Sequence, residues 1–197
     1  MVNLTQMEQK NKLLWLQEWD ANTSTWLADS FLCQKLITLT AEQAEYLHPE
    51  GQLVLGCLNE AGDTPILIQM YPVAGICGPS DKALLTFHHQ LCAPQQYPLL
   101  CDLWGFLGSL SNRPLWNFYY QVLADDSFIQ GFFQARASHH HHHQHAGGLL
   151  EHSHEVAKTA AMLAMQHQLD QKTVAISFLG GLLHDAGKLY LYYNQPA

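Results

Sequence analysis

One stretch of the chain, residues 139–188, contains the residue types from which chemical sites in proteins are built. It starts with a run of histidines and continues through Gly147 and Gly148, which break the chain before an apolar pattern begins. Apolar residues then recur at helical spacing over residues 149–165. We therefore expect His152 in the first turn of an amphipathic helix.

A second apolar pattern, over residues 174–189, predicts another helix that carries His184 and Asp185 late in its length and Lys188 one turn further on. Imidazole and carboxylate groups together suit a divalent transition metal such as Mn, Fe, Ni, Co or Zn, whereas Mg and Ca prefer oxygen ligands alone. A His-Asp pair also occurs often by chance. The residues alone leave both interpretations open.

The order of these residues resembles the HD-domain superfamily of metal-dependent phosphohydrolases, because GGLLEH precedes the first histidine and LLHDAGK surrounds the pair. Within the superfamily, the segment is most similar to bacterial 3′-5′ exoribonucleases that join an OB-fold to an HD domain. A related HD-type domain begins some conjugative relaxases. The matching residues are His142, His143, Gly147, Gly148, Leu149, Leu150, Glu151, His152, Glu155, Val156, Ala157, His184, Asp185, Gly187 and Lys188.

The resemblance implies a role for several of these side chains. His152, His184 and Asp185 would be metal ligands, Asp185 and Lys188 would be catalytic, and Lys188 would be a cation near the scissile phosphate. His142 and His143 would lie near the substrate or a second metal, although a solvated loop for all six histidines of residues 139–145 is an equal alternative. HD domains complete the site with an Asp from a later helix, and no acidic residue follows Asp185 here.

The net charge of -8 argues against a broad nucleic-acid-binding face, which normally carries clustered basic residues. It leaves room for a narrow groove in which a metal and a few lysines face the phosphates. The five cysteines are scattered without a CxxC pair, which is typical of reduced thiols and predicts a cytoplasmic protein. The chain has no signal-peptide pattern and no apolar run of transmembrane length, so we expect no membrane partner.

The first half of the chain predicts a small β-rich domain. Residues 6–19 fit an irregular amphipathic helix, and Thr40 with Gln43 forms a capping-box pattern before a helix over 41–47. Three strands are expected, at residues 52–58, 64–71 and 83–91, of which the first two form a hairpin and the third carries His88 and His89 as an exposed pair. The pattern fits a small barrel or an open α+β sheet, and the resemblance makes it OB-like.

The expected domains are residues 1–93, a linker over 94–98, and a helical HD-type domain over 99–197 that is incomplete at its C-terminus. Helices are predicted over 99–110, 113–122 and 127–135, the last capped by Asp126. The predicted fold class is therefore α+β, with a small N-terminal OB-like domain followed by an α-helical, truncated HD domain.

Two functions are compatible with these features. The first is a metal-dependent phosphohydrolase, more specifically a phosphodiesterase that acts on single-stranded RNA or DNA; Tyr71 and Phe87 can stack bases, although a core position is favoured for both. The alternative is a non-catalytic or regulatory HD-scaffold module in nucleic-acid processing or conjugative transfer. Without later helices, Phe178, Leu182 and Leu183 would be exposed, so we expect a missing C-terminal segment or a homo-oligomer.

Overall fold

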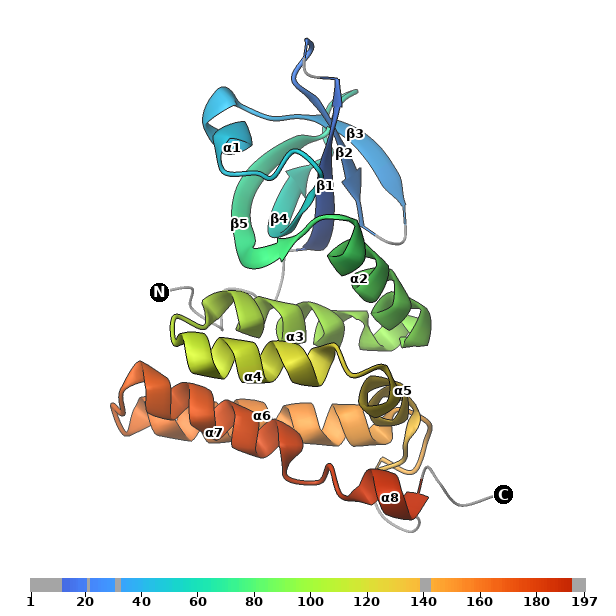
Figure 1. Cartoon of the computed structure of the whole chain (residues 1–197), viewed down its shortest axis with the longest axis vertical. Coiled ribbons are helices and arrows are strands. Elements are labelled where there is room, and N and C mark those ends of the chain that lie inside the picture. Colours follow the sequence, from blue (N-terminus) through green and yellow to red (C-terminus); the bar gives the residue numbers. More distant parts are fainter. Residues whose placement is uncertain (1–11, 21, 31–32, 139–142, 193–197) are drawn as a thin grey trace. The chain divides into compact units, whose positions relative to one another are not determined.

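The computed structural model describes residues 12–20, 22–30, 33–138 and 143–192 (Figure 1). Contacts divide the chain into two compact units. The barrel unit comprises residues up to 90 together with 100–109, and the helical unit comprises 91–99 and the residues from 110 onward. The predicted α+β class is confirmed: the strands lie in the first unit, together with some of the helices, and the second unit is helical.

Five strands form a closed barrel in the order β1-β2-β3-β5-β4 (Figure 1). Neighbouring strands are antiparallel except for β3 and β5, which are parallel, and the pairing of β1 with β4 closes the barrel. The expected hairpin is confirmed as the β4–β5 pair. The strands are β1 (Lys12–Asp20), β2 (Thr25–Asp29), β3 (Gln34–Thr38), β4 (Gln52–Asn59) and β5 (Ile66–Cys77).

Strand β1 corrects the prediction of a helix over residues 6–19, of which residues 6–11 lie outside the described part. Four consecutive apolar residues, Leu13 to Leu16, are fully buried. Leu14 and Leu16 belong to the apolar cluster inside the barrel, with Trp26, Ile37 and Val54 among others. A continuous buried run fits a strand that is covered on both faces, whereas an amphipathic helix buries only one stripe.

Helix α1 (Ala41–Glu45) begins as predicted. The Thr40 hydroxyl accepts a hydrogen bond from the Gln43 amide at 3.2 Å, and the Gln43 side chain accepts one from the Thr40 amide at 3.0 Å. The Gln43 side-chain amide also donates to the Leu67 carbonyl at 3.0 Å, so the cap is tied to strand β5. The capping box is therefore confirmed.

The predicted strand over residues 83–91 is wrong, because Pro79–Leu91 forms helix α2. Proline is favoured in the first turn of a helix, and Asp81 stabilises this end by accepting a hydrogen bond from the Cys77 amide at 2.9 Å. The buried residues Leu85 and His88 are three positions apart, which is helical spacing. His88 is thus completely buried, with its ring centroid 5.4 Å from that of Trp104, and does not form an exposed strand pair with His89.

The three helices predicted between residues 99 and 135 are confirmed with small shifts of their ends, and the third has a different cap from the one predicted. The 3-10 helix Pro94–Gln96 and the start of α3 occupy the expected linker, and the domain boundaries themselves remain a prediction. Asp125, one residue before the predicted cap, accepts a hydrogen bond from the Phe128 amide at 3.0 Å. The helices are α3 (Tyr97–Ser109), α4 (Arg113–Leu123), α5 (Asp126–Gln134), α6 (Gly148–Gln166), α7 (Gln171–Leu183) and α8 (Lys188–Tyr192).

Helices α6 and α7 lie side by side within the helical unit (Figure 1). A Cβ atom on Gly181 of α7 would lie 2.6 Å from the Ala157 Cα atom of α6, so the two backbones approach closely at this point. Phe178 and Leu182 are buried and Leu183 is half-buried, which overturns the expectation that these three residues form an exposed patch.

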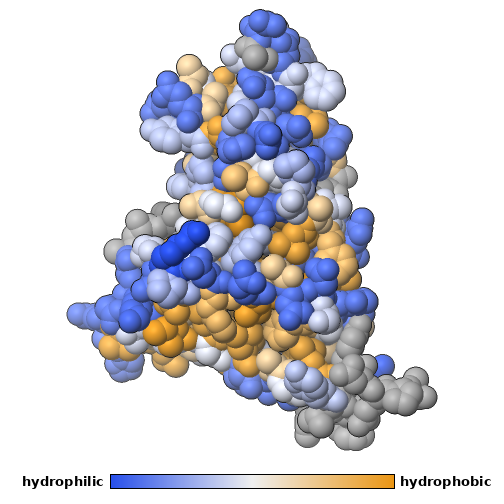
Figure 2. Space-filling view, in the orientation of Figure 1, coloured by the Kyte–Doolittle hydropathy of each residue, from blue (hydrophilic) through white to orange (hydrophobic). Residues whose placement is uncertain are grey.

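Other apolar side chains of α6 and α7 and the turn between them are exposed, namely Met162, Leu163, Met165, Leu169 and Ile176. Figure 2 shows hydrophobic residues on the surface of the helical unit. Among the described residues, no helix has the length and apolar character needed to cross a membrane.

Candidate metal centre

The start of helix α6 depends on two glycines. Gly147 has a positive φ of 82°, and a Cβ atom there would collide with the side-chain amide of Gln96. A Cβ atom on Gly148 would collide with the carbonyl group of His143. The Gly148 amide also donates a hydrogen bond to the His145 carbonyl at 3.0 Å. The glycines therefore allow residues 143–146, here called the histidine loop, to fold back against the first turn of α6.

Helix α7 ends at Leu183, so the predicted single helix over residues 174–189 is divided in two. His184 is the C-cap of α7, and Asp185 lies in the turn that follows. The Lys188 amide donates to the Asp185 carbonyl at 2.9 Å, and α8 begins at that lysine. Asp185 is therefore positioned by a turn between two helices and not by a helix interior.

The structure brings together all three residues predicted as metal ligands. The His152 Nε2 atom lies 3.4 Å from Asp185 Oδ2, and the His184 Nε2 atom lies 3.1 Å from the same oxygen. One ligand atom from each of the three residues falls within 4.8 Å of the others. The arrangement requires the close packing of α6 and α7, because one helix supplies His152 and the other leads into His184 and Asp185.

Neighbouring groups prepare these side chains for metal binding. The Nδ1 atom of His184 lies 2.7 Å from the Gly181 carbonyl oxygen. A carbonyl only accepts hydrogen bonds, so Nδ1 carries the proton and Nε2 presents a lone pair; a hydrogen bond of this kind commonly orients metal-bound histidines.

Protonation also favours metal binding. Burial lowers the pKa of His152 against the opposing charge of Asp185, and this favours the neutral imidazole that a metal requires. Burial alone would raise the pKa of Asp185. The Lys188 hydrogen bond and the electrostatic effects of His184, Lys188 and His152 outweigh burial, so the pKa of Asp185 is lowered. Neutral imidazole and ionised carboxylate are the forms that bind metal.

The spacing of the donor atoms fits a divalent transition metal. Bonds of about 2.0–2.1 Å in a tetrahedral site place neighbouring ligand atoms about 3.3 Å apart. The two distances to Asp185 Oδ2, 3.1 and 3.4 Å, lie on either side of that value. Lys188 Nζ lies 2.6 Å from the same Asp185 oxygen, so the catalytic pair expected from the sequence, Asp185 and Lys188, is also in direct contact.

A second group of side chains, His143, His145 and Glu151, lies beside the three candidate ligands. Of the two predicted substrate-binding residues, His142 lies outside the described residues, and the His143 ring centroid is 5.7 Å from that of His152. The sequence interpretation gave no role to His145, Glu151 or Glu155. Glu151 and Glu155 are four residues apart, so both carboxylates lie on one side of α6. This spacing could have indicated from the sequence that the two carboxylates act together.

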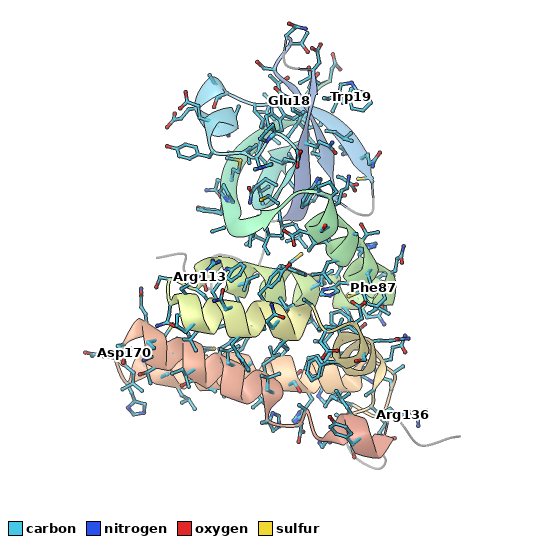
Figure 3. All side chains as sticks on the ribbon, in the orientation of Figure 1. Glu18, Trp19, Phe87, Arg113, Arg136 and Asp170 are labelled. Atoms are coloured by element: carbon cyan, nitrogen blue, oxygen red, sulfur yellow. The ribbon has the colours of Figure 1, made fainter. Side chains whose placement is uncertain are left out.

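The barrel unit offers few groups for binding phosphates. Its three described lysines, Lys12, Lys35 and Lys82, are all within 4 Å of a carboxylate oxygen: the distances are 3.3 Å and 2.9 Å to Glu60 for the first two, and 3.6 Å to Asp29 for the third. Aromatic surface is available. Trp19 is 64% exposed and points away from the barrel (Figure 3).

Tyr71 and Phe87, the two aromatic residues considered for base stacking, differ in position. Tyr71 lies on strand β5 and is 42% exposed, so the favoured expectation of a core position is wrong for it. Phe87 lies on helix α2 and is partly buried, so it is not part of the sheet. Among the strands, Trp19 and Tyr71 are the aromatic side chains with substantial exposure in the described part of the barrel.

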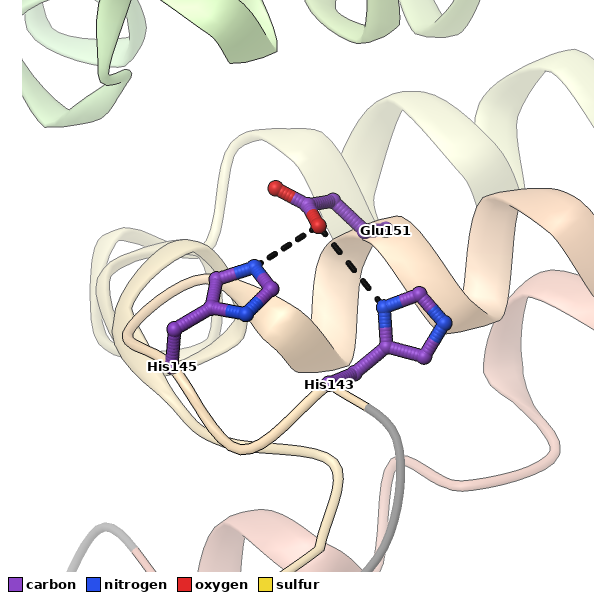
Figure 4. A group of neighbouring side chains, drawn as sticks. All are labelled: His143, His145 and Glu151. Carbon is purple, nitrogen blue, oxygen red and sulfur yellow. Dashed lines mark hydrogen bonds and ion pairs between the residues drawn. The ribbon is translucent and has the colours of Figure 1, made fainter.

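Figure 4 shows the second group, which joins the histidine loop to the first turn of α6. The His145 Nε2 atom lies 2.7 Å from Glu151 Oε2, and the His143 Nδ1 atom lies 3.7 Å from the same oxygen. The His143 Nε2 atom faces Glu155 Oε2 at 3.3 Å. Imidazole groups therefore extend from this loop, through His152, to His184.

Comparison with known proteins identifies one related family. Residues 122–197 match the family model of the HDOD domain. No curated protein and no solved structure shows a significant match to the chain. The matched segment contains the three predicted metal ligands and both glycines at the start of α6. The match supports the assignment of this C-terminal part of the chain to the HD-type superfamily.

Proposed function

We propose that the chain is a metal-dependent phosphohydrolase whose centre consists of His152, His184 and Asp185. The observation that carries the proposal is the convergence of two imidazole Nε2 atoms on one Asp185 oxygen, at 3.4 and 3.1 Å. The HDOD match supports an HD-type module around this centre. A site with three protein ligands retains open positions for water and substrate, which is typical of catalytic and not of structural metal sites.

The side chains have separable roles in this proposal. When bound, a divalent metal at such a site lowers the pKa of water and polarises a phosphoryl oxygen. His152, His184 and Asp185 would hold the metal, and the Gly181 carbonyl keeps His184 in the tautomer that this requires. Lys188 is hydrogen-bonded to Asp185 and supplies a cation that can bind a non-bridging phosphate oxygen.

We further propose single-stranded RNA or DNA as the substrate, so that the reaction is hydrolysis of a phosphodiester. A closed barrel of five strands is compatible with an OB-fold, and such folds bind single strands through aromatic stacking and basic grooves. Trp19 and Tyr71 are exposed aromatic groups that support stacking in the barrel unit.

A second candidate, a non-catalytic or regulatory HD-scaffold module, is favoured by the charges. All three described lysines of the barrel unit are already paired with carboxylates, so they are not available as free cations for a phosphate backbone. Lys188 also binds the same Asp185 oxygen that the two imidazoles face. The ammonium group would thus occupy the position of a metal in a module that has lost turnover.

Metal content and turnover, measured on the same preparations of the whole chain, separate the two candidates. The substrates are bis(p-nitrophenyl) phosphate and a single-stranded oligonucleotide, each with Mn²⁺ or Zn²⁺. His184→Gln and Asp185→Asn should each lose the ion bound at the centre, and with it turnover. His167→Gln, an exposed histidine at the other end of α6, is the matched control and should change neither.

Lys188→Gln tests the catalytic role directly. It should keep the metal but reduce turnover by about 10²- to 10³-fold, the usual effect of removing one group that stabilises charge in the transition state. Metal binding by the unmodified chain without hydrolysis of either substrate would support the regulatory module. If His184→Gln keeps both the metal and the turnover of the unmodified chain, the proposed centre is refuted.

A further inference from the structure

The group formed by His143, His145 and Glu151 has the composition of a metal site and is separate from the centre described above. We propose that it binds a second divalent transition metal, of the borderline class to which Zn²⁺ belongs. Its donors come from the histidine loop and the first turn of α6, and one ligand atom from each residue lies within 4.8 Å of the others. The proposal does not depend on hydrolysis by the chain.

The distances within the group are close to those of a metal site. Glu151 Oε2 lies 2.7 Å from His145 Nε2 and 3.7 Å from His143 Nδ1 (Figure 4). These values lie on either side of the roughly 3.3 Å that separates ligand atoms around a tetrahedral ion. Side-chain shifts of about half an ångström would make both distances equal to it. Two imidazoles and one carboxylate are also a donor set that transition metals prefer to Mg or Ca.

Glu155 selects the nitrogen of His143 that faces the proposed ion. Its Oε2 atom lies 3.3 Å from His143 Nε2. The Glu155 carboxylate accepts a hydrogen bond from Nε2, so the proton stays on Nε2 and Nδ1 is unprotonated on the side of Glu151. Such carboxylate–histidine pairs orient metal-bound imidazoles in many proteins. We therefore assign Glu155 as a positioning residue and His143 Nδ1 as the ligand atom.

The charge of Glu151 also favours a cation. Its ion-pair and hydrogen-bond partners among the described residues are His143 and His145, whereas Asp185 has the ammonium group of Lys188. Glu151 is also largely shielded from solvent, with 24% of its side chain exposed. A divalent ion would supply the missing positive charge.

The backbone of the histidine loop is fixed in a conformation that suits this role. His143 has a φ of 61°, a left-handed conformation that residues other than glycine seldom adopt. The Ala137 amide donates a hydrogen bond to the His143 carbonyl at 3.1 Å, and the Gly148 amide donates one to the His145 carbonyl at 3.0 Å. Both histidines are thus held from outside the loop, and strained backbone of this kind is concentrated at functional sites.

The test counts Zn²⁺ ions per chain by mass spectrometry of metals after removal of free Zn²⁺. All measurements use a background variant in which residues 139–142 are changed to Asn, so that the rest of the histidine run cannot bind Zn²⁺. This background should retain two ions. His145→Gln and Glu151→Gln should each reduce the number to one, and circular dichroism shows whether each variant is folded. His167→Gln should retain two.

Combination with the first centre makes the two proposals distinguishable. His184→Gln should also leave one ion, and the double variant with His145→Gln should leave none. A single ion in the background, or two ions in folded His145→Gln and Glu151→Gln chains, would overturn the second site. A count of one that falls to zero with His184→Gln alone would uphold the first centre and refute the second. If His145→Gln retains two ions and Glu155→Gln loses one, the proposed site is wrong. The second ion is then bound by the alternative group of His143, His152 and Glu155.

Discussion

Replacement of Gly181 by alanine should separate helices α6 and α7 and weaken both the fold and the metal centre. The new Cβ atom would lie 2.6 Å from Ala157 Cα and 2.8 Å from Ala157 N. These are backbone atoms, so no side-chain rotation can relieve the contact. The helices would have to move apart by several tenths of an ångström or more, and His152 would then move away from His184.

Gly180 provides a matched control in the next position of the same helix. Among the described residues, a Cβ atom there would meet no atom within 4 Å apart from its chain neighbours and the backbone of its own helix. Alanine gains about 1 kcal/mol over glycine in a helix interior, and the gain applies to both positions. The difference between the two variants therefore isolates the steric contact, for which overpacking costs of about 1–3 kcal/mol are usual. Gly180→Ala should be stabilised by up to about 1 kcal/mol, and Gly181→Ala should be less stable than Gly180→Ala by about 1–3 kcal/mol.

Thermal unfolding and Zn²⁺ titration measure the two effects. For a chain of this size, each 1 kcal/mol corresponds to a shift in Tm of about 2–4 °C. The Gly181 carbonyl also orients His184. Alanine keeps this carbonyl, but the movement of α7 would displace it from His184. The loss of such a supporting contact lowers metal affinity by about 10- to 100-fold. Gly180→Ala should bind Zn²⁺ like the unmodified chain. Equal Tm and equal Zn²⁺ affinity in the two variants would show that the close approach of α6 and α7 does not position the centre.

Two further predictions concern stability. In the barrel unit, the buried Gln52 side-chain amide donates to the Val73 carbonyl at 2.8 Å and the Ile76 carbonyl at 3.1 Å. Gln52→Leu should lower the free energy of unfolding by about 2–3 kcal/mol in denaturant unfolding, because buried acceptors lose their donor. A decrease no larger than that of the exposed control Gln69→Leu would refute this role. In the helical unit, hydrogen bonds from the Thr173 side chain and backbone lower the pKa of Asp170, the N-cap of α7. The lowered pKa of Asp170 gives stability that is present above the usual pKa of 3.8 and is lost as pH falls through the lowered value. The Tm of the unmodified chain should therefore exceed that of Asp170→Asn at pH 5, and the difference should shrink on acidification. A difference in Tm that does not change with pH would contradict this prediction.

The resemblance to HD domains identified His152, His184 and Asp185 as candidate ligands, and the spacing of the two helical patterns explains why the structure brings these side chains together. His152 follows a glycine pair by one helical turn, and His184 and Asp185 follow an apolar run that ends at Leu183. Once two amphipathic helices joined by a short turn pack along their apolar faces, these side chains meet at one end of the pair. The point at which α7 stops was not predictable, because apolar residues continue to Leu189 across the turn that contains Asp185.

The errors in the barrel unit have two different causes. The apolar run Leu13 to Leu16 is short enough to fit either a helix or a doubly covered strand, and only closure of the barrel decides between them. In α2, the residues Gly78 to Asp81 are compatible with a turn before a strand and also, through Pro79 and Asp81, with the start of a helix. In the helical unit, His145 was missed for another reason, because a run of similar residues contains no spacing from which a position can be inferred.

Charge connects the two proposed metal sites to the proposed substrate. Three carboxylates (Glu151, Glu155 and Asp185) and one ammonium group (Lys188) lie along the row of imidazoles in the described structure, so the row has two net negative charges when its histidines are neutral. A phosphate ester would be repelled from this surface. One divalent ion makes the row neutral, and two make it positive. If both ions bind, an anionic substrate is attracted only to the fully loaded chain, and phosphate affinity should depend on the second site even where the first centre performs the chemistry.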